Sequence, residues 1–345
     1  MLTEQQSLII RYVQAIGIIF VVMGHYPIRP VDIMQPYLFH MPLFFFLGGI
    51  LYHEKSFLTL CKSILRKHIL YIIYTYIIIG SIATFILNDI SPLAINKIFK
   101  NGFFDTILFT LKSNFHNNSF FLVAWFLFAY SIVSICSNIL ISIVKNKLTL
   151  LFIALTLGYF AVEYLSIDYK NNKLQGINLL IQVMYGTMFY IIGYIFKKDI
   201  FKLNQVYIPI IILVILFTEK INFNMKVMVM SWSQYPDGFI MHSMNAILCI
   251  IFIFSVCSLI SSKEYKIIKL IGRHSKSIMS YHLLSFILLD FLFSLIWKYD
   301  LSNIRGLSHY STKEFWFLYV IVGVFIPISI ELFYNRIIIK IKPLI

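Results

Sequence analysis

The stretch RYVQAIGIIFVVMGHYPIRPVDIMQPYLFHMPLFFFLGGILYH, residues 11–53, predicts the architecture of this chain. It contains two apolar segments joined by a short polar turn, with one histidine near each junction, His25 and His40. At about 1.5 Å per residue, His25 lies roughly 25 Å along a helix that begins near Leu8. Pro27 ends this helix because proline cannot continue the hydrogen-bond ladder. We therefore predict a helical hairpin that places both imidazoles at a similar depth.

The composition is that of a membrane protein. Hydrophobic residues make up 59% of the 345 residues and charged residues 13%, whereas a soluble domain carries about 25% charged residues. Ten segments are close to the length of about 20 residues that crosses a bilayer core. These predicted spans are residues 7–26, 37–53, 66–87, 119–142, 148–166, 177–197, 205–222, 239–260, 277–298 and 315–336. We expect an all-α polytopic membrane protein, a single domain over residues 1–345, built as a bundle of about ten transmembrane helices.

The net charge of +14 is distributed unevenly between the two sides of the predicted bundle. Nearly all of the positive excess lies on the side of the N-terminus, with rich loops at residues 54–68 and 261–276. The positive-inside rule then predicts that both termini are cytoplasmic. Segment 88–118 is a long polar excursion that we expect to hold a short re-entrant or interfacial helix around residues 103–112. The charge orients the protein in the membrane, so we do not predict a nucleic-acid partner.

His25 and His40 are candidate acid–base groups. An ionisable side chain in an apolar span costs free energy and is a functional-site hypothesis by default, and histidine titrates near neutral pH. A helix C-terminus favours protonated His25, and a helix N-terminus favours neutral His40. The alternative is a pair of interfacial histidines that cap helices or bind their neighbours.

Other polar residues are expected at the cytoplasmic side. Gln14 and His282 each lie several residues into a predicted span and form a second polar layer there, unless His282 serves a helix–helix hydrogen bond. Arg66 and Lys67 precede the third long span. They either follow from topology or form a phosphate-binding lip for an anionic cosubstrate.

Signals of soluble enzymes and metal sites are missing from the sequence. There is no P-loop, no GxSxG and no HExxH motif. Neither a cysteine cluster nor an acidic cluster completes a metal site with the two histidines. We expect no metal and no bound cofactor. Trp125 lies near the outer end of its span, where an aromatic-belt anchor is the simplest interpretation.

Four blocks occur in a recognisable order: IGIIFVVMGH (16–25), FHMPLFFFLGGILY (39–52), AWFLFA (124–129) and IGRHSKSIMSYHLL (271–284). Together they resemble the membrane acyltransferase-3 family, and within it the branch of fucose 4-O-acetylase-like sugar acetyltransferases. The second block, which follows a first helix ending in Gly-His, is the most specific of the four. The resemblance extends over nearly the whole chain.

The resemblance implies a ten-helix enzyme of the bacterial plasma membrane. Such an enzyme takes an acyl group, acetyl by default, from cytoplasmic acyl-CoA. It transfers that group to a hydroxyl of a cell-surface glycan or its lipid-linked precursor. By position, His25 corresponds to the histidine regarded as catalytic, and His40 to the histidine before the MPLFFF run. His282 and Trp125 correspond to the histidine of the late helix and the tryptophan of the WFL block.

One position departs from the family pattern. The family usually carries a basic residue eleven positions before the first-helix histidine, where this chain has Gln14, and an acid three positions earlier, where it has Arg11. Residues three apart share a helix face, so Arg11 can reach the same polar layer. The departure otherwise indicates altered donor handling or a degraded enzyme.

These observations lead to a hypothesis of O-acyl transfer. His25 is the general base and His40 orients His25 or the acceptor, because a thioester donor needs only a base and a stabilised oxyanion. Trp125 contacts the acceptor. The donor route is lined by Arg11, Gln14 and His282, and its phosphates are held by Arg66 and Lys67. The expected partners are acetyl-CoA, a glycan or lipid-linked sugar, and membrane lipids. A flippase for a lipid-linked sugar and an inactive scaffold are the alternatives, although the chain shows no paired broken helices typical of transporters.

Overall fold

A computed structural model describes residues 2–26, 34–89, 102–118, 120–223, 225–297, 300–303, 307–310 and 315–341. The described part consists of helices, with one isolated β-bridge between Val229 and Gln234. The α-helices are α1 (Glu4–Gly24), α2 (His40–Ile50), α3 (Phe57–Ile64), α4 (Leu70–Asp89), α5 (Phe103–Lys112), α6 (Ala124–Ile143), α7 (Lys147–Phe160), α8 (Ser166–Asn172), α9 (Gln175–Phe196), α10 (Tyr207–Phe223), α11 (Gly238–Ile260), α12 (Lys266–Arg273), α13 (Ser275–Trp297) and α14 (Trp316–Ile341). Shorter 3-10 or π-helical segments are η1 (Pro36–Leu38), η2 (Leu65–Ile69), η3 (Ala161–Leu165), η4 (Ile200–Lys202), η5 (Met230–Trp232) and η6 (Leu301–Asn303).

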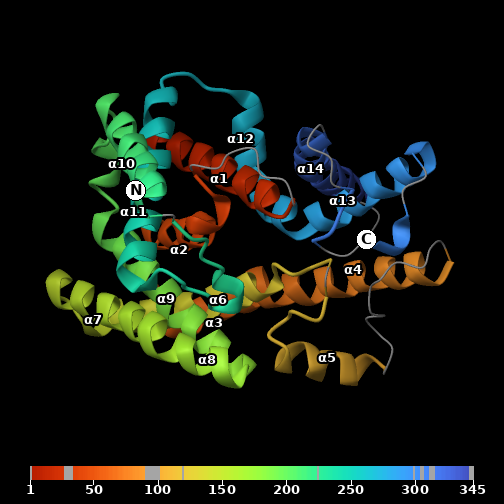
Figure 1. Ribbon diagram of the computed structural model, residues 1–345, viewed down its shortest axis with the longest axis horizontal. Coiled ribbons are helices and arrows are strands. Elements are labelled where there is room, and N and C mark those ends of the chain that lie inside the picture. The colour runs from red at the N-terminus through yellow and green to blue at the C-terminus, as the bar shows by residue number, and fades with distance from the viewer. Residues whose placement is uncertain are drawn as a thin grey trace.

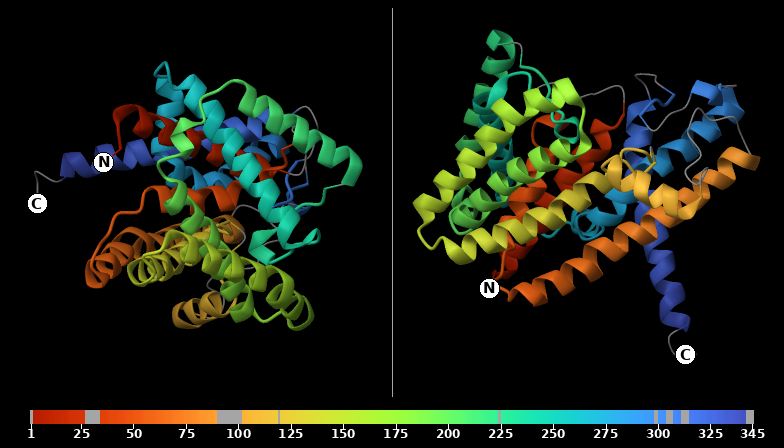
Figure 2. Two further views of the ribbon diagram at one scale, coloured as in Figure 1. Left: turned by 90° about the vertical axis from the view of Figure 1, so that its left-hand side faces the viewer. Right: turned by 90° about the horizontal axis from the view of Figure 1, so that it is seen from below.

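The predicted all-α polytopic architecture is confirmed. Eight helical segments of the described chain are long and apolar enough to cross a membrane. They are Glu4–Gly24, Phe57–Phe85, Ala124–Ile143, Lys147–Asn172, Gln175–Phe196, Gly238–Ile260, Ser275–Trp297 and Trp316–Arg336. The two other predicted spans correspond to α2 with 11 residues and α10 with 17 residues. The start of α1 and the end of α14 lie at the same end of the helical body (Figure 2). A count of ten spans and cytoplasmic termini stay predictions.

Several boundaries differ from the sequence-based expectation. The span expected at 37–53 is helical only over α2, because residues 36–38 form a 3-10 turn and Leu51 ends the helix. The third span begins at Phe57 rather than at residue 66, since α3, the π-helical turn η2 and α4 form one continuous rod. The helix expected around 103–112 is present as α5, which runs beside α4 (Figures 1 and 2). Helix α12 within the basic loop 261–276 was not predicted.

Close backbone approaches bring the helices of the core together. A Cβ on Gly49 of α2 would lie 1.8 Å from the Tyr190 carbonyl oxygen of α9, and one on Gly193 would lie 2.1 Å from the Phe46 carbonyl oxygen. Small residues allow such crossings in membrane bundles, where packing drives helix association. A Cβ on Gly272 would lie 2.0 Å from the Arg11 carbonyl oxygen, so α12 crosses α1 at that residue.

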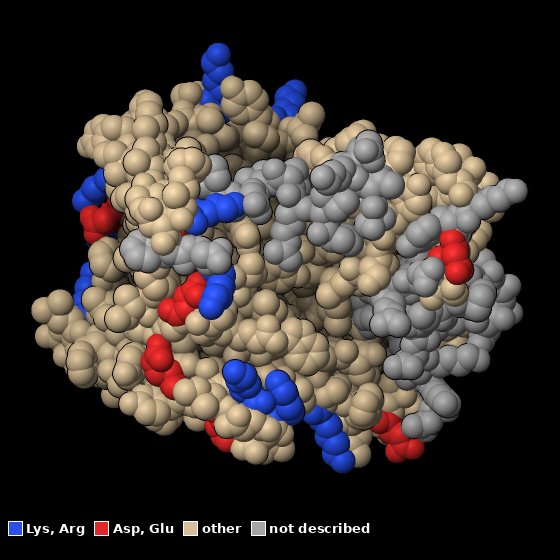
Figure 3. All heavy atoms as spheres, in the orientation of Figure 1, with Lys and Arg blue, Asp and Glu red and all other residues tan. Residues whose placement is uncertain are grey.

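The apolar character of the exposed surface is that of a protein surrounded by lipid. Large apolar side chains are exposed on α4, α5, α7 and α10. On the face shown in Figure 3, broad uncharged areas separate the described Lys, Arg, Asp and Glu side chains. Such a surface is normal against hydrocarbon and would be a large exposed patch in a soluble protein.

Candidate active site

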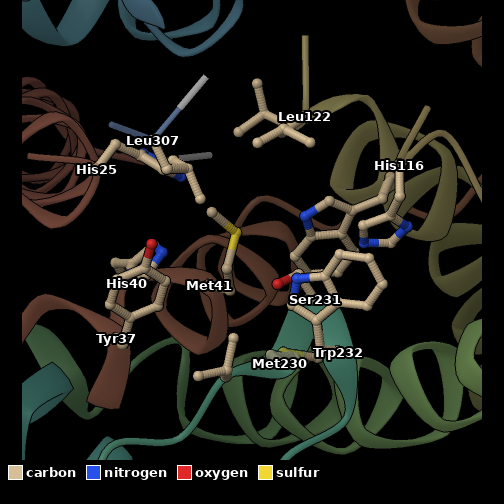
Figure 4. A pocket seen from close by; sticks show the side chains of 13 residues that line it. His25, Tyr37, His40, Met41, His116, Leu122, Met230, Ser231, Trp232 and Leu307 are labelled. Carbon is tan, nitrogen blue, oxygen red and sulfur yellow. The ribbon is translucent and has the colours of Figure 1, made fainter. Parts of the chain in front are cut away.

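A cavity of about 220 Å³ lies at the end of the bundle where α1 ends and α2 begins. We call it the histidine cavity, and its lining residues are His25, Tyr37, His40, Met41, His116, Leu122, Val123, Trp125, Val229, Met230, Ser231, Trp232 and Leu307. Figure 4 shows His25 and His40 on one side of it and His116 and Trp232 on the other. His25, His40 and Trp125, all predicted as site residues, are thus brought together in one cavity.

His25 is the C-cap of α1, one residue beyond the helix. Its Nδ1 lies 2.9 Å from the Val21 carbonyl oxygen and 3.1 Å from Nε2 of His282. The buried His282 of α13 places its own Nδ1 2.9 Å from the Met279 carbonyl oxygen. A carbonyl oxygen only accepts, so neutral His282 carries its proton on Nδ1 and offers the Nε2 lone pair. His25 must then donate from Nδ1, which leaves the lone pair of His25 on Nε2.

This contact corrects the predicted place of His282. The sequence suggested a cytoplasmic polar layer shared with Gln14, but His282 touches His25 at the other end of α1. The prediction assumed that α13 starts at the membrane surface, at the level where α1 starts. Instead, the preceding helix α12 packs its Gly272 against Arg11, partway along α1. From Ser275, where α13 begins, α13 rises about 10 Å to His282, which lies at the level of the cavity.

His40 occupies the first turn of α2 and is buried. Its Nδ1 lies 2.5 Å from the Pro36 carbonyl oxygen, so neutral His40 donates from Nδ1 and carries its lone pair on Nε2. The ring of Tyr37 lies 5.1 Å from the ring of His40 and 6.1 Å from the ring of His25. Both histidines that line the cavity near Tyr37 therefore have a defined tautomer.

His116 and Trp232 are among the lining residues that the sequence analysis did not predict. They come from turns that precede α6 and α11, and their rings lie 4.1 Å apart. Burial lowers the pKa of His116 and favours its neutral form. Both turns contain polar and aromatic residues, which is a weak sequence signal for a binding site. Nothing in the sequence indicates that the two turns contact each other.

A buried carboxylate anchors the segment that carries Leu307. Asp290 of α13 accepts hydrogen bonds from the backbone N–H of Tyr310 at 2.9 Å and from the hydroxyl of Tyr319, and it lies 2.7 Å from Nδ1 of His309. Buried charges are stable only when paired in this way. Asp290 therefore holds the wall of the cavity and does not line it.

A second cavity, of about 190 Å³, lies at the opposite end of α2. We call it the basic cavity, and its lining residues are Gly48, Leu51, Tyr52, His53, Lys55, Leu60, Ser63, Ile64, Lys67, His68, Tyr130, Ser134, Asn138 and Tyr190. Helices α2 and α6 line both cavities. From Met41 to Gly48, α2 rises about 10 Å, so the two cavities are about that far apart along the helix.

The residues predicted to bind the acyl donor do not lie together in the structure. Lys67 of η2 lines the basic cavity. Its backbone carbonyl oxygen accepts a hydrogen bond from Lys276 Nζ at 2.5 Å. Arg66 is exposed and does not line this cavity. Arg11 is also exposed, and its Nη1 donates to Gln14 Oε1 at 3.1 Å. Neither Arg11 nor Gln14 lines the basic cavity, and the donor role of both stays a prediction.

Comparison with known proteins gives one match. The family model of the acyltransferase domain, Acyl_transf_3, matches residues 8–334. No curated protein and no solved structure matches the chain. The matched range includes both cavities and all the site residues predicted from the sequence.

Proposed function

The chain belongs to the acyltransferase-3 family and is an acyltransferase, and from that premise we propose that it transfers an acetyl group from cytoplasmic acetyl-CoA to a sugar hydroxyl. The acceptor is a cell-surface polysaccharide or its lipid-linked precursor, and the protein works in the bacterial plasma membrane. Family membership favours an enzyme over a flippase. The observation that carries the proposed chemistry is the contact between His282 and His25.

The contact between the two histidines prepares His25 as a general base. Its Nε2 lone pair takes the proton of the acceptor hydroxyl while the hydroxyl oxygen attacks the thioester carbonyl carbon. The imidazolium that forms is stabilised because its Nδ1–H points at the Val21 carbonyl oxygen and at the lone pair of His282. When the carbon–sulfur bond breaks, the CoA thiolate takes the proton back from Nε2. The products are the sugar ester and CoA, and His25 returns to its starting tautomer.

His40 orients the acceptor in this proposal. Its Nε2 lone pair accepts a hydrogen bond from a second hydroxyl of the sugar, since its Nδ1 is committed to Pro36. Trp125, only 4% exposed, forms part of the wall against which the sugar lies. His282 is a positioning residue, because it acts through His25.

The donor reaches His25 from the basic cavity. Lys67 and Lys55 line that cavity and are suited to the phosphates of CoA. The separation of about 10 Å along α2 is within reach of the extended arm that joins the nucleotide of CoA to its thioester. The basic cavity lies toward the end of the bundle where α1 begins. Since we predict that the N-terminus is cytoplasmic, the basic cavity is expected to face the cytoplasm, where acetyl-CoA is made.

The test is replacement of His25 by Ala in cells that carry no other copy of the gene. O-acetyl esters on the surface glycan are expected to fall by about 10²- to 10⁴-fold, because a general base contributes that much. The amount of inserted protein and its elution from a sizing column should match wild type. Full acetylation by a folded His25→Ala protein rejects the proposal.

A further inference from the structure

The wall of the histidine cavity opposite His25 has no part in the proton transfer, although a network of buried hydrogen bonds fixes its position. It consists of the turn that carries His116 and the turn at residues 229–234 that carries Trp232. The two rings lie 4.1 Å apart, tilted by 39°, and Figure 4 shows them across the cavity from His25 and His40. We call His116 and Trp232 the aromatic wall.

A buried polar network on α9 holds both turns of the wall. Gln182, which is 0% exposed, accepts a hydrogen bond from Asn114 Nδ2 at 2.9 Å and donates from Nε2 to the Ser231 carbonyl oxygen at 2.8 Å. Asn178, also 0% exposed, donates to the same carbonyl at 3.0 Å and accepts from Ser233 Oγ at 2.6 Å. These buried hydrogen bonds restrict Gln182 and Asn178 to one arrangement. Gln182 thus joins the residue two positions before His116 to the residue just before Trp232.

The backbone next to each ring is held in an uncommon conformation. Asn114 and Phe115, just before His116, have φ of 48° and 64°, and Ser233, just after Trp232, has φ of 45°. A bulky residue such as Phe at positive φ costs of the order of 1–3 kcal/mol and persists only where the surroundings impose it. Such residues cluster at ligand sites, so the strain on both turns supports a binding role for the rings between them.

Trp232 is 39% exposed, although its two neighbours, Ser231 and Ser233, are hydrogen-bonded to α9. The rest of the lining offers few polar partners, since Met41, Leu122, Val123 and Met230 are apolar. The ligand that fits is one with an apolar face and hydroxyls at its rim, which describes a pyranose ring with its C–H bonds against an aromatic plane. A cavity of about 220 Å³ is smaller than the roughly 300–1,000 Å³ of sites for drug-sized ligands, so it encloses one sugar ring.

We propose that the aromatic wall is the acceptor subsite, where one pyranose ring of the glycan stacks on Trp232 and directs a hydroxyl across the cavity to His25. The inference rests on the proposed function and assigns the acceptor side of that reaction to residues on α9 and the two turns. Trp232 contacts the substrate, while Gln182 is a positioning residue that acts through Ser231 and Asn114. The aromatic wall binds the apolar face of the sugar ring more than its individual hydroxyls. The remainder of the glycan extends through the cavity opening.

The experiment separates acceptor binding from donor binding. Membrane vesicles that contain the full-length chain are assayed with radiolabelled acetyl-CoA and with surface polysaccharide of the host cells, stripped of O-acetyl groups by mild base. Trp232→Ala is expected to raise the KM for polysaccharide about tenfold, a typical value for a lost aromatic contact, and to leave the KM for acetyl-CoA unchanged. Trp232→Phe keeps an aromatic face and should stay within about twofold of wild type.

Two further variants make the result specific. Gln182→Leu should raise the KM for polysaccharide as Trp232→Ala does, because it releases the wall from α9. Trp316→Ala is the matched control, since Trp316 does not line the histidine cavity, and it should leave both KM values unchanged.

The outcomes are distinguishable from those of the proposed function. An unchanged polysaccharide KM in Trp232→Ala overturns the aromatic wall as acceptor subsite. A loss confined to kcat, or a parallel rise of both KM values, assigns Trp232 a structural role and overturns it as well. If wild-type vesicles transfer no acetyl group to the polysaccharide, the proposed function itself fails.

Discussion

The histidine cavity and the basic cavity share α2 and α6 but hold their polar groups in different ways. In the histidine cavity, His25 and His40 each direct Nδ1 at a carbonyl oxygen four residues earlier, which selects one tautomer. In the basic cavity, Lys55 of the loop between α2 and α3 and Lys67 of η2 are exposed side chains. The difference matches the two tasks, because proton transfer needs one direction and one protonation state, whereas an anion is held by charge that can adjust.

The largest effect is expected from separating the helices that both cavities share. In Gly49→Leu, the new Cβ would lie 1.8 Å from the Tyr190 carbonyl oxygen, so α2 and α9 cannot keep their contact. We expect a loss of more than about 4 kcal/mol and little folded protein. The yield of monodisperse protein in detergent measures it. Gly176→Leu is the control, since nothing lies within 4 Å of a Cβ there. Equal yields for both variants would show that this crossing does not hold the cavities together.

The second prediction concerns the tautomer of His25. His282→Leu removes one of the two acceptors for the His25 Nδ1–H and leaves the Val21 carbonyl oxygen, so it should lower kcat by about 10- to 100-fold with little change in either KM. His282→Gln can still offer a carbonyl oxygen to that N–H, so it should retain more activity. Steady-state transfer kinetics and thermal unfolding of each variant are the measurements. Equal activity of the Leu and Gln variants would contradict the role given to the His282 lone pair.

A smaller effect is expected at the basic cavity, where Lys67 and Arg66 are neighbours in the sequence but differ in position. Lys67→Ala should raise the KM for acetyl-CoA about three- to tenfold and leave kcat unchanged, because a charge-assisted contact to phosphate is lost. Arg66→Ala should change it less, since Arg66 lies outside the cavity. Kinetics at low and high salt check the electrostatic origin. A larger effect for Arg66→Ala would place the donor phosphates elsewhere.

The smallest effect concerns pH and the aromatic wall. Burial lowers the pKa of His116 in the folded protein, so its neutral form is favoured there. As pH falls below about 6.5, the unfolded chain binds a proton that the folded state resists, and stability declines. His116→Leu removes this component, so its unfolding temperature should depend less on pH than that of wild type. Parallel pH curves would show that His116 is not held neutral.

The sequence alone was sufficient for the parts of the site that depend on local pattern. His25 and His40 were found because each adjoins the junction of an apolar segment and a polar turn, and Pro27 ends the first of these segments. α5 was placed at residues 103–112 from composition within a polar segment. The helix boundaries were less accurate, because α3 and η2 extend the third span before its apolar stretch begins.

Contacts between segments that are distant in the sequence could not be predicted from it. His282 was assigned to the wrong end of α1, since its depth depends on where α12 crosses α1 at Gly272. His116 and Trp232 were not found at all, because the two turns that carry them are far apart in the sequence and are brought together by hydrogen bonds to Gln182 of α9. Arg66 and Lys67 were treated as a pair, but η2 turns them to different places.

The sequence by itself determined that this is a helical membrane protein with two histidines at one end of a hairpin, and its four motif blocks indicated the acyltransferase-3 family. Hydropathy and residue order are sufficient for this, because backbone groups in lipid must be hydrogen-bonded within the protein. A helix satisfies them within a single segment. Tertiary structure alone decided which residue contacts His25, which lysines line the basic cavity and which rings form the aromatic wall. Those relations depend on helix crossings set by close backbone packing, and such packing has no signature in any single segment.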